Sequence, residues 1–297
     1  MKNRYFKKLK ILVVCGGWSN EREVSLLSGN NIFKCLKINN YNAELFILNK
    51  SNFEKLFKKK PDLIFNALHG EFGEDGFFSN LAKKNNISFT HSDDLTSAIC
   101  FDKRLLKTFL KKKLNITSPL EIDNFKDIQL PLISKPIRGG SSNGVNVISS
   151  YSSLNKFKSK KNHMLEEAIV GKELTVTVIE DQNKTIPLAV TEIEFDNLVY
   201  DYNAKYTEGE SIHYLPARIS KKQYKYLMNL SVKIFKACSC RSIARLDFIL
   251  SAKNKKFYFL ELNTHPGLTK ISLAPEQANF KKMSYLNLIE KIIISSL

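Results

Sequence analysis

The sequence lacks any apolar run that approaches the roughly 18 residues needed to cross a lipid bilayer. Basic residues near the amino terminus precede a short apolar stretch at residues 11–15. This stretch is too short for the hydrophobic core of a signal peptide, which has about 7–15 residues. A second short apolar stretch close to residue 297 indicates the end of a packed helix. We therefore expect a cytoplasmic protein with no membrane partner.

Cysteine is also scarce, with five among 297 residues, an odd number at irregular spacings. That arrangement is not typical of a disulfide framework. Cys238 and Cys240 have neither a second cysteine pair nor a matching histidine, so we do not expect a zinc site. We interpret the five cysteines as buried, reduced thiols.

Acidic residues are few relative to basic ones, 29 against 46, which leaves a net charge of +17. Such an excess suits a nucleic-acid partner. The lysines are scattered, however, with short runs at 58–60, 111–113 and 156–161, and no aromatic-interleaved basic motif accompanies them. We interpret the charge as a lysine-rich surface and expect no nucleic-acid partner. A basic nucleic-acid-binding protein remains the alternative from another functional class.

The first 90 residues have the rhythm of an α/β domain. Residues 10–17 predict a buried strand that ends in a Gly-Gly turn, and a helix follows with Asn20 as its expected N-cap. Two more apolar runs, at 43–48 and 62–68, predict further strands. This βαβ order predicts a parallel sheet whose ligand edge lies at the carboxyl ends of its strands.

The rest of the chain predicts α+β structure, which we divide into segments 91–172 and 173–297. Helical residues 94–113 lead into strands around 131–136 and 145–149. Further strands are expected at 173–180, 186–195, 244–250 and 257–263, with a helix over 221–239. The polar connection 196–218 is long, and connections of this length are uncommon unless they have a function.

Oxygen ligands gather on the last two predicted strands. Glu261 and Asn263 lie two residues apart, so both side chains point to one face of their strand. If that strand pairs with the one that carries Asp247, the three side chains form an oxygen-rich cluster. Mg²⁺ prefers such ligands and keeps other positions for water and phosphate. The alternative is a polar ladder on a half-exposed sheet, which the flanking apolar runs disfavour.

Three glycine-rich turns supply further candidates. Lys135 precedes the turn RGGSSNGV, where backbone amides could approach phosphate, although a plain β-hairpin would use the same residues. Glu21 follows Gly-Gly at a helix start, where it either faces a substrate ammonium or simply complements the helix dipole. His69 begins HGEFGEDG and either faces a cleft or is structural. Spacing alone leaves these alternatives open.

Taken together, these segments resemble the D-alanine–D-alanine ligase family of the ATP-grasp superfamily. The resemblance covers almost the whole chain in collinear order, through GGWSNEREVSL, HGEFGEDG, SKPIRGGSSNGV, DYNAKYTEG, ARLDFIL and LELNTHPGLT. It implies an ATP-grasp fold with an N-terminal, Rossmann-like parallel-sheet domain at 1–90. Segments 91–172 and 173–297 would be the central and C-terminal ATP-grasp subdomains, with a mobile loop at 196–218.

The resemblance also implies roles for individual residues. Nucleotide contacts would come from Lys103, Lys135, Glu166, Ala168, Ile169, Glu173 and Lys205. Two Mg²⁺ ions, for which Mn²⁺ could substitute, would be held by Asp247, Glu261 and Asn263. The catalytic groups would be Glu21, Ser141, Tyr206, Arg245 and Gly267, of which the first three close the loop over the site and the last two form the oxyanion hole. The D-alanine substrates would be contacted by Glu21, His69, Ser272 and Leu273.

The implied reaction is ATP-dependent joining of two D-alanines through an acyl phosphate, for peptidoglycan synthesis, by a homodimer. Another ATP-grasp carboxylate–amine ligase with a different amino acid is the alternative within enzymes. The sequence departs from the family pattern at Trp18, at Gly139 and before Ser272, where a common histidine is missing. Lys205 and Tyr206 are kept, which favours a dipeptide product.

Overall fold

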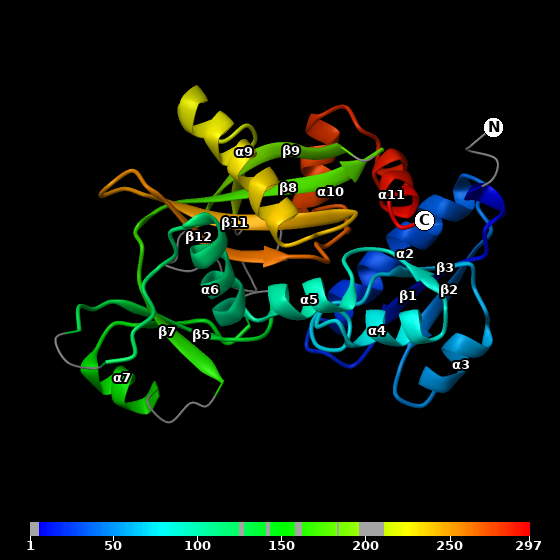
Figure 1. Ribbon diagram of the computed structural model, residues 1–297, viewed down its shortest axis with the longest axis horizontal. Helices are drawn as coiled ribbons and strands as arrows, with labels where there is room; N and C mark the ends of the chain where they lie inside the picture. Colours follow the sequence, from blue (N-terminus) through cyan, green and yellow to red (C-terminus); the bar gives the residue numbers. More distant parts are fainter. Residues whose placement is uncertain (1–5, 125–127, 141–142, 158–161, 183, 196–210) are drawn as a thin grey trace.

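The computed structural model describes residues 6–124, 128–140, 143–157, 162–182, 184–195 and 211–297. These residues form three β-sheets with helices packed around them. Figure 1 shows the first sheet at one end of the molecule and the other two sheets, one above the other, toward the opposite end. Within the described residues, no helix combines the length and the apolar character that a membrane span requires.

The first sheet is parallel, as its βαβ rhythm predicts. It has the order β2-β1-β3-β4, from β1 (Ile11–Gly16), β2 (Ala43–Leu48), β3 (Leu63–Asn66) and β4 (Ser88–Phe89). Helices α2 (Arg22–Ile38), α3 (Phe53–Lys58) and α4 (Phe77–Lys84) connect the strands. The expectation that Asn20 caps α2 is wrong, because Glu21 occupies the N-cap position and makes no side-chain capping bond.

A helical connection leads to a small antiparallel sheet. The stretch expected as one helix is two, α5 (Asp94–Phe101) and α6 (Lys103–Leu114), because Asp102 between them has extended backbone angles and caps α6 by accepting a bond from the Leu105 amide. The sheet has the order β6-β5-β7, from β5 (Leu132–Pro136), β6 (Asn146–Ile148) and β7 (His163–Glu167), with α7 (Tyr151–Phe157) beside it.

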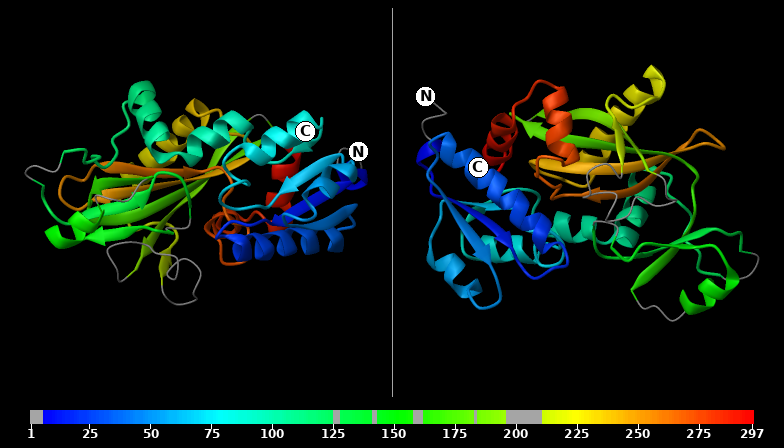
Figure 2. Two further views of the ribbon diagram at one scale, coloured as in Figure 1. Left: turned by 90° about the horizontal axis from the view of Figure 1, so that it is seen from below. Right: turned by 180° about the vertical axis from the view of Figure 1, so that it is seen from behind.

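The third sheet is antiparallel, with the order β10-β9-β8-β11-β12. Its strands are β8 (Gly171–Asp181), β9 (Lys184–Glu194), β10 (Ile212–Tyr214), β11 (Ile243–Ser251) and β12 (Phe257–Asn263). Helix α9 (Lys221–Ala237) begins with a complete capping box at Ser220 and Gln223. Figure 2 shows α9 and α10 (Leu273–Phe280) beside this sheet.

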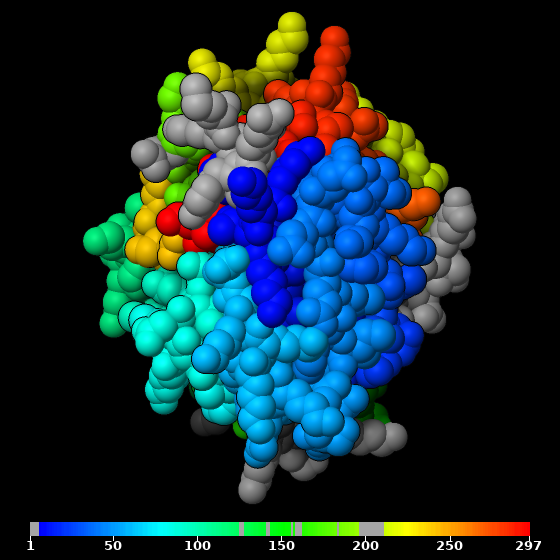
Figure 3. Space-filling view, turned by 90° about the vertical axis from the view of Figure 1, so that its right-hand side faces the viewer, coloured from blue at the N-terminus to red at the C-terminus, as the bar shows by residue number. Residues whose placement is uncertain are grey.

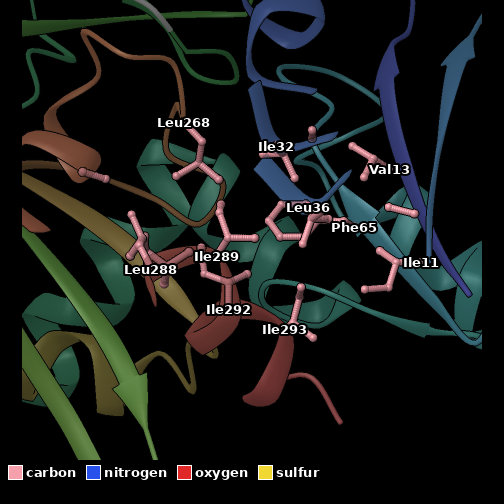
Figure 4. Packing of buried hydrophobic residues seen from close by; sticks show 14 of the residues in the cluster. Ile11, Val13, Ile32, Leu36, Phe65, Leu268, Leu288, Ile289, Ile292 and Ile293 are labelled. Carbon is pink, nitrogen blue, oxygen red and sulfur yellow. The ribbon is translucent and has the colours of Figure 1, made fainter. Parts of the chain in front are cut away.

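The C-terminal helix closes the fold against the first sheet. One hydrophobic cluster contains Ile11, Phe65 and Ile32 together with Leu288 and Ile292 of α11 (Tyr285–Ile294), and Figure 4 shows these side chains directed at one another. At this end of the molecule, Figure 3 shows C-terminal residues beside the N-terminal ones. Burial of this apolar surface stabilises the contact between the third sheet and the first. Residues from both ends of the chain are thereby held in fixed positions relative to one another.

The five cysteines carry free thiols, as expected. Cys15, Cys100, Cys238 and Cys240 are buried. The expectation of burial is wrong for Cys35 of α2, which is half-buried.

Candidate active site

A pocket lies between the small antiparallel sheet and the five-stranded sheet. Its walls come from β5 and β7 on one side and from β8, β11 and β12 on the other, with the loop after β5 and the start of α6 completing them. Eight predicted residues line it: Lys103, Lys135, Glu166, Ala168, Ile169, Glu173, Asp247 and Glu261. A smaller adjoining cavity shares Lys103 and Glu261 with this pocket and adds Asn263. The structure therefore brings the nucleotide and metal candidates together.

The predicted pairing of the two oxygen-bearing strands is confirmed. In the antiparallel register of β11 and β12, Asp247 lies opposite Glu261 and Arg245 lies opposite Asn263. The Asp247 carboxylate receives hydrogen bonds from the Arg245 guanidinium, 2.8 Å away, and from the Thr175 hydroxyl at 2.6 Å. The Glu261 carboxylate lies 3.3 Å from the Lys103 ammonium. Both carboxylates therefore face cations within the pocket wall.

This donor set suits Mg²⁺ bound together with phosphate. Two carboxylates and an amide supply three hard oxygen ligands and leave other positions for phosphate oxygens and water. Among the described residues, no cluster of three or more His, Cys, Asp or Glu side chains has the arrangement of a metal site. A site built from Asp247, Glu261 and Asn263 does not require one, because its third ligand is an amide. The residues present fit the ion.

Buried charges surround the lysine on β5. The Glu166 carboxylate bridges two ammonium groups, that of Lys135 at 2.6 Å and that of Lys107. Burial raises the pKa of Glu166, but the two lysine charges outweigh it and hold the pKa below its usual value. Burial, assisted by the Lys135 charge, lowers the pKa of Lys107 to about 7. Burial opposes the charge on Lys135, yet the Glu166 carboxylate raises the pKa of Lys135 overall.

A second group of side chains lies at the carboxyl edge of the first sheet. The ring of His69 is held by the Glu74 carboxylate, 3.1 Å from Nδ1, and by the Ser28 hydroxyl, 3.3 Å from Nε2. Glu21 is buried, and a methyl group placed on Gly140 or on Gly70 would lie 3.0 Å or 3.3 Å from its Oε1 atom. Glu21 therefore lies between the His-Gly turn of the first sheet and the glycine loop that follows β5.

Glu74 and His69 form a buried acid–base pair. Burial raises the pKa of Glu74 to about 7. Burial pushes the pKa of His69 down, but the hydrogen bond and charge of Glu74, with the Glu21 charge, raise it overall. The sequence left open whether His69 faces a cleft or is structural. Both side chains of the pair are almost fully buried, so the role of His69 depends on its interaction with Glu74.

The turn after β12 carries the remaining candidates. A side chain on Gly267 would come within 2.8 Å of the Ser272 hydroxyl oxygen, so Ser272 would have to shift to admit one. That hydroxyl accepts a hydrogen bond from the Thr269 amide at 3.1 Å. Ser272 precedes the first turn of α10, which begins with Leu273, a buried side chain that packs near Ile193. Gly267, Ser272 and Leu273 are therefore neighbours.

Three predicted residues, Ser141, Lys205 and Tyr206, lie outside the described residues, as does most of the loop 196–218. Trp18 packs against Phe72 with ring centroids 4.3 Å apart and planes tilted by 42°, and it lines a groove separate from the pocket. Sequence reasoning missed two charged residues of the site, Glu74 and Lys107. Glu74 lies within the glycine-rich HGEFGEDG segment, which was a signal for it. Lys107 resembles its many neighbouring lysines and gave none.

Comparison with known proteins agrees with this geometry. A family model described as the D-ala D-ala ligase C-terminus matches residues 107–294. A D-alanine–D-alanine ligase of Rickettsia canadensis is 38% identical, over 97% of this chain and 84% of the relative. One of Carboxydothermus hydrogenoformans is 36% identical, over 97% of this chain and 98% of the relative.

Solved structures extend the comparison. The D-alanine–D-alanine ligase of Bacillus anthracis complexed with ATP has a TM-score of 0.79 at 29% identity, covering 97% of both chains. The VanG D-Ala:D-Ser ligase of Enterococcus faecalis has a TM-score of 0.81 at 26% identity, covering 98% of this chain and all of the other. The two facing antiparallel sheets and the pocket between them thus have the ATP-grasp fold. Within that fold class, the chain belongs to the D-alanine–D-alanine ligase family.

Proposed function

We propose that this protein joins two D-alanine molecules into D-alanyl-D-alanine at the expense of ATP, and so supplies a peptidoglycan precursor. The observation that carries the proposal is one pocket in which Lys103, Lys135, Asp247 and Glu261 converge. The buried Glu21 and His69 lie beyond the glycine loop that closes one end of that pocket.

In the first step, the carboxylate of one D-alanine attacks the γ-phosphate of ATP, and an acyl phosphate and ADP result. Negative charge spreads over the transferring phosphoryl oxygens, so fixed cations lower the barrier. Lys103 and Lys135 supply two such cations, and both are buried at the pocket wall, where charges act more strongly than in water. The acceptors now facing them, Glu261 and Glu166, hold the two ammonium groups in place.

We assign the nucleotide's remaining contacts to the residues around β7 and the start of β8. Glu166, Ala168 and Ile169 would face the adenine, and Glu173 would face the ribose hydroxyls. The double ion pair of Glu166 fixes its carboxylate in one position. Asp247, Glu261 and Asn263 would hold two Mg²⁺ ions, with Mn²⁺ able to replace them. These ions would neutralise phosphate charge when bound.

In the second step, the amine of the other D-alanine attacks the acyl carbon, and phosphate leaves. We assign the oxyanion to the Arg245 side chain and the Gly267 amide, since preorganised donors of this kind stabilise such a transition state by roughly 3–4 kcal/mol each. Ser272 and Leu273 would meet the carboxylate of the second D-alanine. Glu21 would bind the ammonium of the first, with His69 close by.

Acyl phosphates react readily with water, so the site has to be closed during turnover. We assign closure to a hydrogen-bonded triad of Glu21, Ser141 and Tyr206 that closes the 196–218 loop over the site, with Lys205 reaching the γ-phosphate. We further propose domain boundaries at 1–90, 91–172 and 173–297, a homodimeric assembly and a cytoplasmic location, where ATP is available and the free thiols stay reduced.

The experiment is ATP consumption with Mg²⁺ across a panel of D- and L-amino acids, with the dipeptides identified by mass spectrometry. When D-alanine is the only amino acid in the assay, we expect phosphate release and formation of D-alanyl-D-alanine. D-serine and D-lactate, each paired with D-alanine, test the choice of the second substrate. A mixed product formed faster than D-alanyl-D-alanine would assign a different ligase activity to the same site. No nucleotide-dependent product with any amino acid would exclude the proposal.

A further inference from the structure

His91 combines an unfavourable backbone with complete burial. It lies two residues after the end of β4 with a φ of 75°, in the left-handed region that residues with a side chain rarely adopt. Only 2% of the residue is exposed. A glycine would take this conformation at no steric cost. Strain of this kind persists where the surroundings hold it in place, and it is frequent at functional sites.

The ring of His91 is the part that makes specific contacts. It stacks on the ring of His265, with centroids 4.5 Å apart and planes 22° from parallel. It also meets Phe65 of β3 in an edge-to-face contact, with centroids 5.8 Å apart. Its Nδ1 atom lies 2.9 Å from the Thr90 hydroxyl, while Nε2 has no hydrogen-bond partner among the described residues. The ring is therefore fixed by packing more than by hydrogen bonds.

His265 is in turn part of the turn that carries the proposed oxyanion donor. Its backbone amide donates to Asn263 Oδ1 at 2.7 Å. The Asn66 amide nitrogen lies 3.2 Å from His265 Nε2 and can only donate, so Nε2 accepts and Nδ1 carries the proton toward the Thr264 hydroxyl, 3.0 Å away. The orientation of Asn66 is itself fixed, because its oxygen accepts from the Leu68 amide and its nitrogen donates to the Gly73 carbonyl.

Both rings are buried, and two aromatic surfaces in near-parallel contact at this centroid distance attract one another.

We propose that His91 is a positioning residue, whose ring holds His265 and so fixes the turn 263–267 that presents the Gly267 amide to the reacting acyl group. This role rests on the proposed function, since it gives the turn its catalytic meaning. His91 follows the last strand of the first sheet and His265 follows β12 of the third, so the stack links the position of one sheet to the oxyanion donor beside another.

The test compares H91G with H91F and with the control variant N86G. H91G removes the ring and suits the backbone. H91F keeps an aromatic ring at the same place. Asn86 also has a left-handed backbone, with a φ of 54°, but lies on a loop before β4 and makes no ring contact, so N86G controls for the change to glycine.

For H91G we expect dipeptide formation to fall about tenfold, less than the roughly 10²–10³-fold loss on deleting an oxyanion donor, because the donor is displaced and not removed. The KM for ATP should stay within about twofold, and phosphate should be released in excess of dipeptide, since acyl phosphate still forms but is captured poorly. H91F and N86G should keep at least half of wild-type turnover with one phosphate per dipeptide. Wild-type coupling in H91G, or equal loss in H91F and H91G, would overturn the stacking role.

A second measurement separates this inference from the proposed function. Hydrogen exchange of the full chain should show the amides of residues 263–268 exchanging at least tenfold faster in H91G than in wild type or N86G. If neither the wild type nor any variant makes dipeptide, the proposed function fails. Faster exchange in H91G would still support the positioning role of His91 in that case. Unchanged exchange in H91G overturns that role whatever the activity.

Discussion

At the scale of single residues, the site is a set of charges that have been removed from water and compensate one another. Glu166 bridges Lys107 and Lys135, Glu261 faces Lys103, and Asp247 is paired with Arg245. An isolated buried charge is costly, whereas a paired one is tolerated. The same charges become available to a nucleotide and its metal ions, whose own charges can replace these partners.

The first prediction concerns Glu261→Gln. The change keeps the shape of the side chain but removes the negative charge, so we expect turnover to fall by about 10²–10³-fold if the carboxylate holds a metal ion against the phosphates. The midpoint of thermal unfolding should change little. The control is Glu44→Gln, which removes the charge of a β2 residue that is paired with Lys59, and it should leave turnover unchanged. Unaltered phosphate release in Glu261→Gln would show that the metal assignment is wrong.

The second prediction concerns the pH dependence of stability. Glu74 has a pKa of about 7 in the fold against an ordinary value of 4.5, so the folded protein holds a proton that the unfolded chain releases between these values. His69, whose pKa is raised, contributes stability below 6.5 that is lost as the pH rises through its folded value. Both effects lower the free energy of unfolding as the pH rises from about 4.5 to 7 and beyond, by on the order of 1–3 kcal/mol.

Glu74→Gln removes the titrating carboxyl and the charge that raises the pKa of His69. Urea unfolding at pH 5.5 and pH 8 should therefore show a smaller pH-dependent change in the free energy of unfolding than in wild type. An unchanged slope would mean that Glu74 is ionised throughout this range.

Single residues of the site were predicted best where a sequence pattern has a direct geometric consequence. Period-two alternation placed Glu261 and Asn263 on one face, and the structure pairs their strand with β11, in which Asp247 lies opposite Glu261. Lys107 was not foreseen, because its carboxylate partner lies 59 residues away and nothing in a lysine-rich helix marks which of its lysines are buried.

At the scale of elements, close packing decides which residues a helix tolerates. In α2, a methyl group on Gly29 would lie 2.3 Å from the Cβ atom of Cys15 on β1. The third prediction is that Gly29→Ala destabilises the protein by about 1–2 kcal/mol. Alanine gains about 1 kcal/mol of helix propensity, but overpacking costs about 1–3 kcal/mol, and a contact this short lies at the upper end.

The measurement for Gly29→Ala is the free energy of unfolding in urea. Leu27→Ala, on an exposed position of the same helix, is the control and should stay within about 0.5 kcal/mol of wild type. A Gly29→Ala variant as stable as wild type would show that α2 and β1 are packed less closely than described.

Element types were predicted well and element boundaries less so. The parallel sheet follows from alternating apolar strands and helices, since crossover helices connect parallel strands. The division of residues 94–114 into α5 and α6 did not follow, because Asp102 is compatible with a helix by composition and ends one only through its extended backbone and cap. Asn20 was a plausible cap by residue type, but the chain turns one residue later.

At the scale of the whole molecule, the arrangement of the three sheets is what makes a site. The helix α11 packs against the first sheet through a shared hydrophobic cluster that includes Leu268 of the turn after β12, as Figure 4 shows. The Leu268 amide donates to the Ser28 hydroxyl, which lies 3.3 Å from His69 Nε2, so the turn is held near His69. This arrangement could be predicted from the sequence only through the family resemblance, since no local sequence pattern indicates which face of α11 contacts which sheet. The net charge of +17 by itself would have favoured a nucleic-acid partner.

The central claim is that this site activates a D-alanine carboxylate by phosphorylating it. The most direct measurement uses D-alanine labelled with ¹⁸O in its carboxyl group, together with ATP and Mg²⁺, and mass spectrometry of the phosphate released. Our account predicts one ¹⁸O atom in each phosphate formed with dipeptide, because that oxygen leaves with the phosphoryl group when the amine attacks. Dipeptide formed together with unlabelled phosphate would contradict the account.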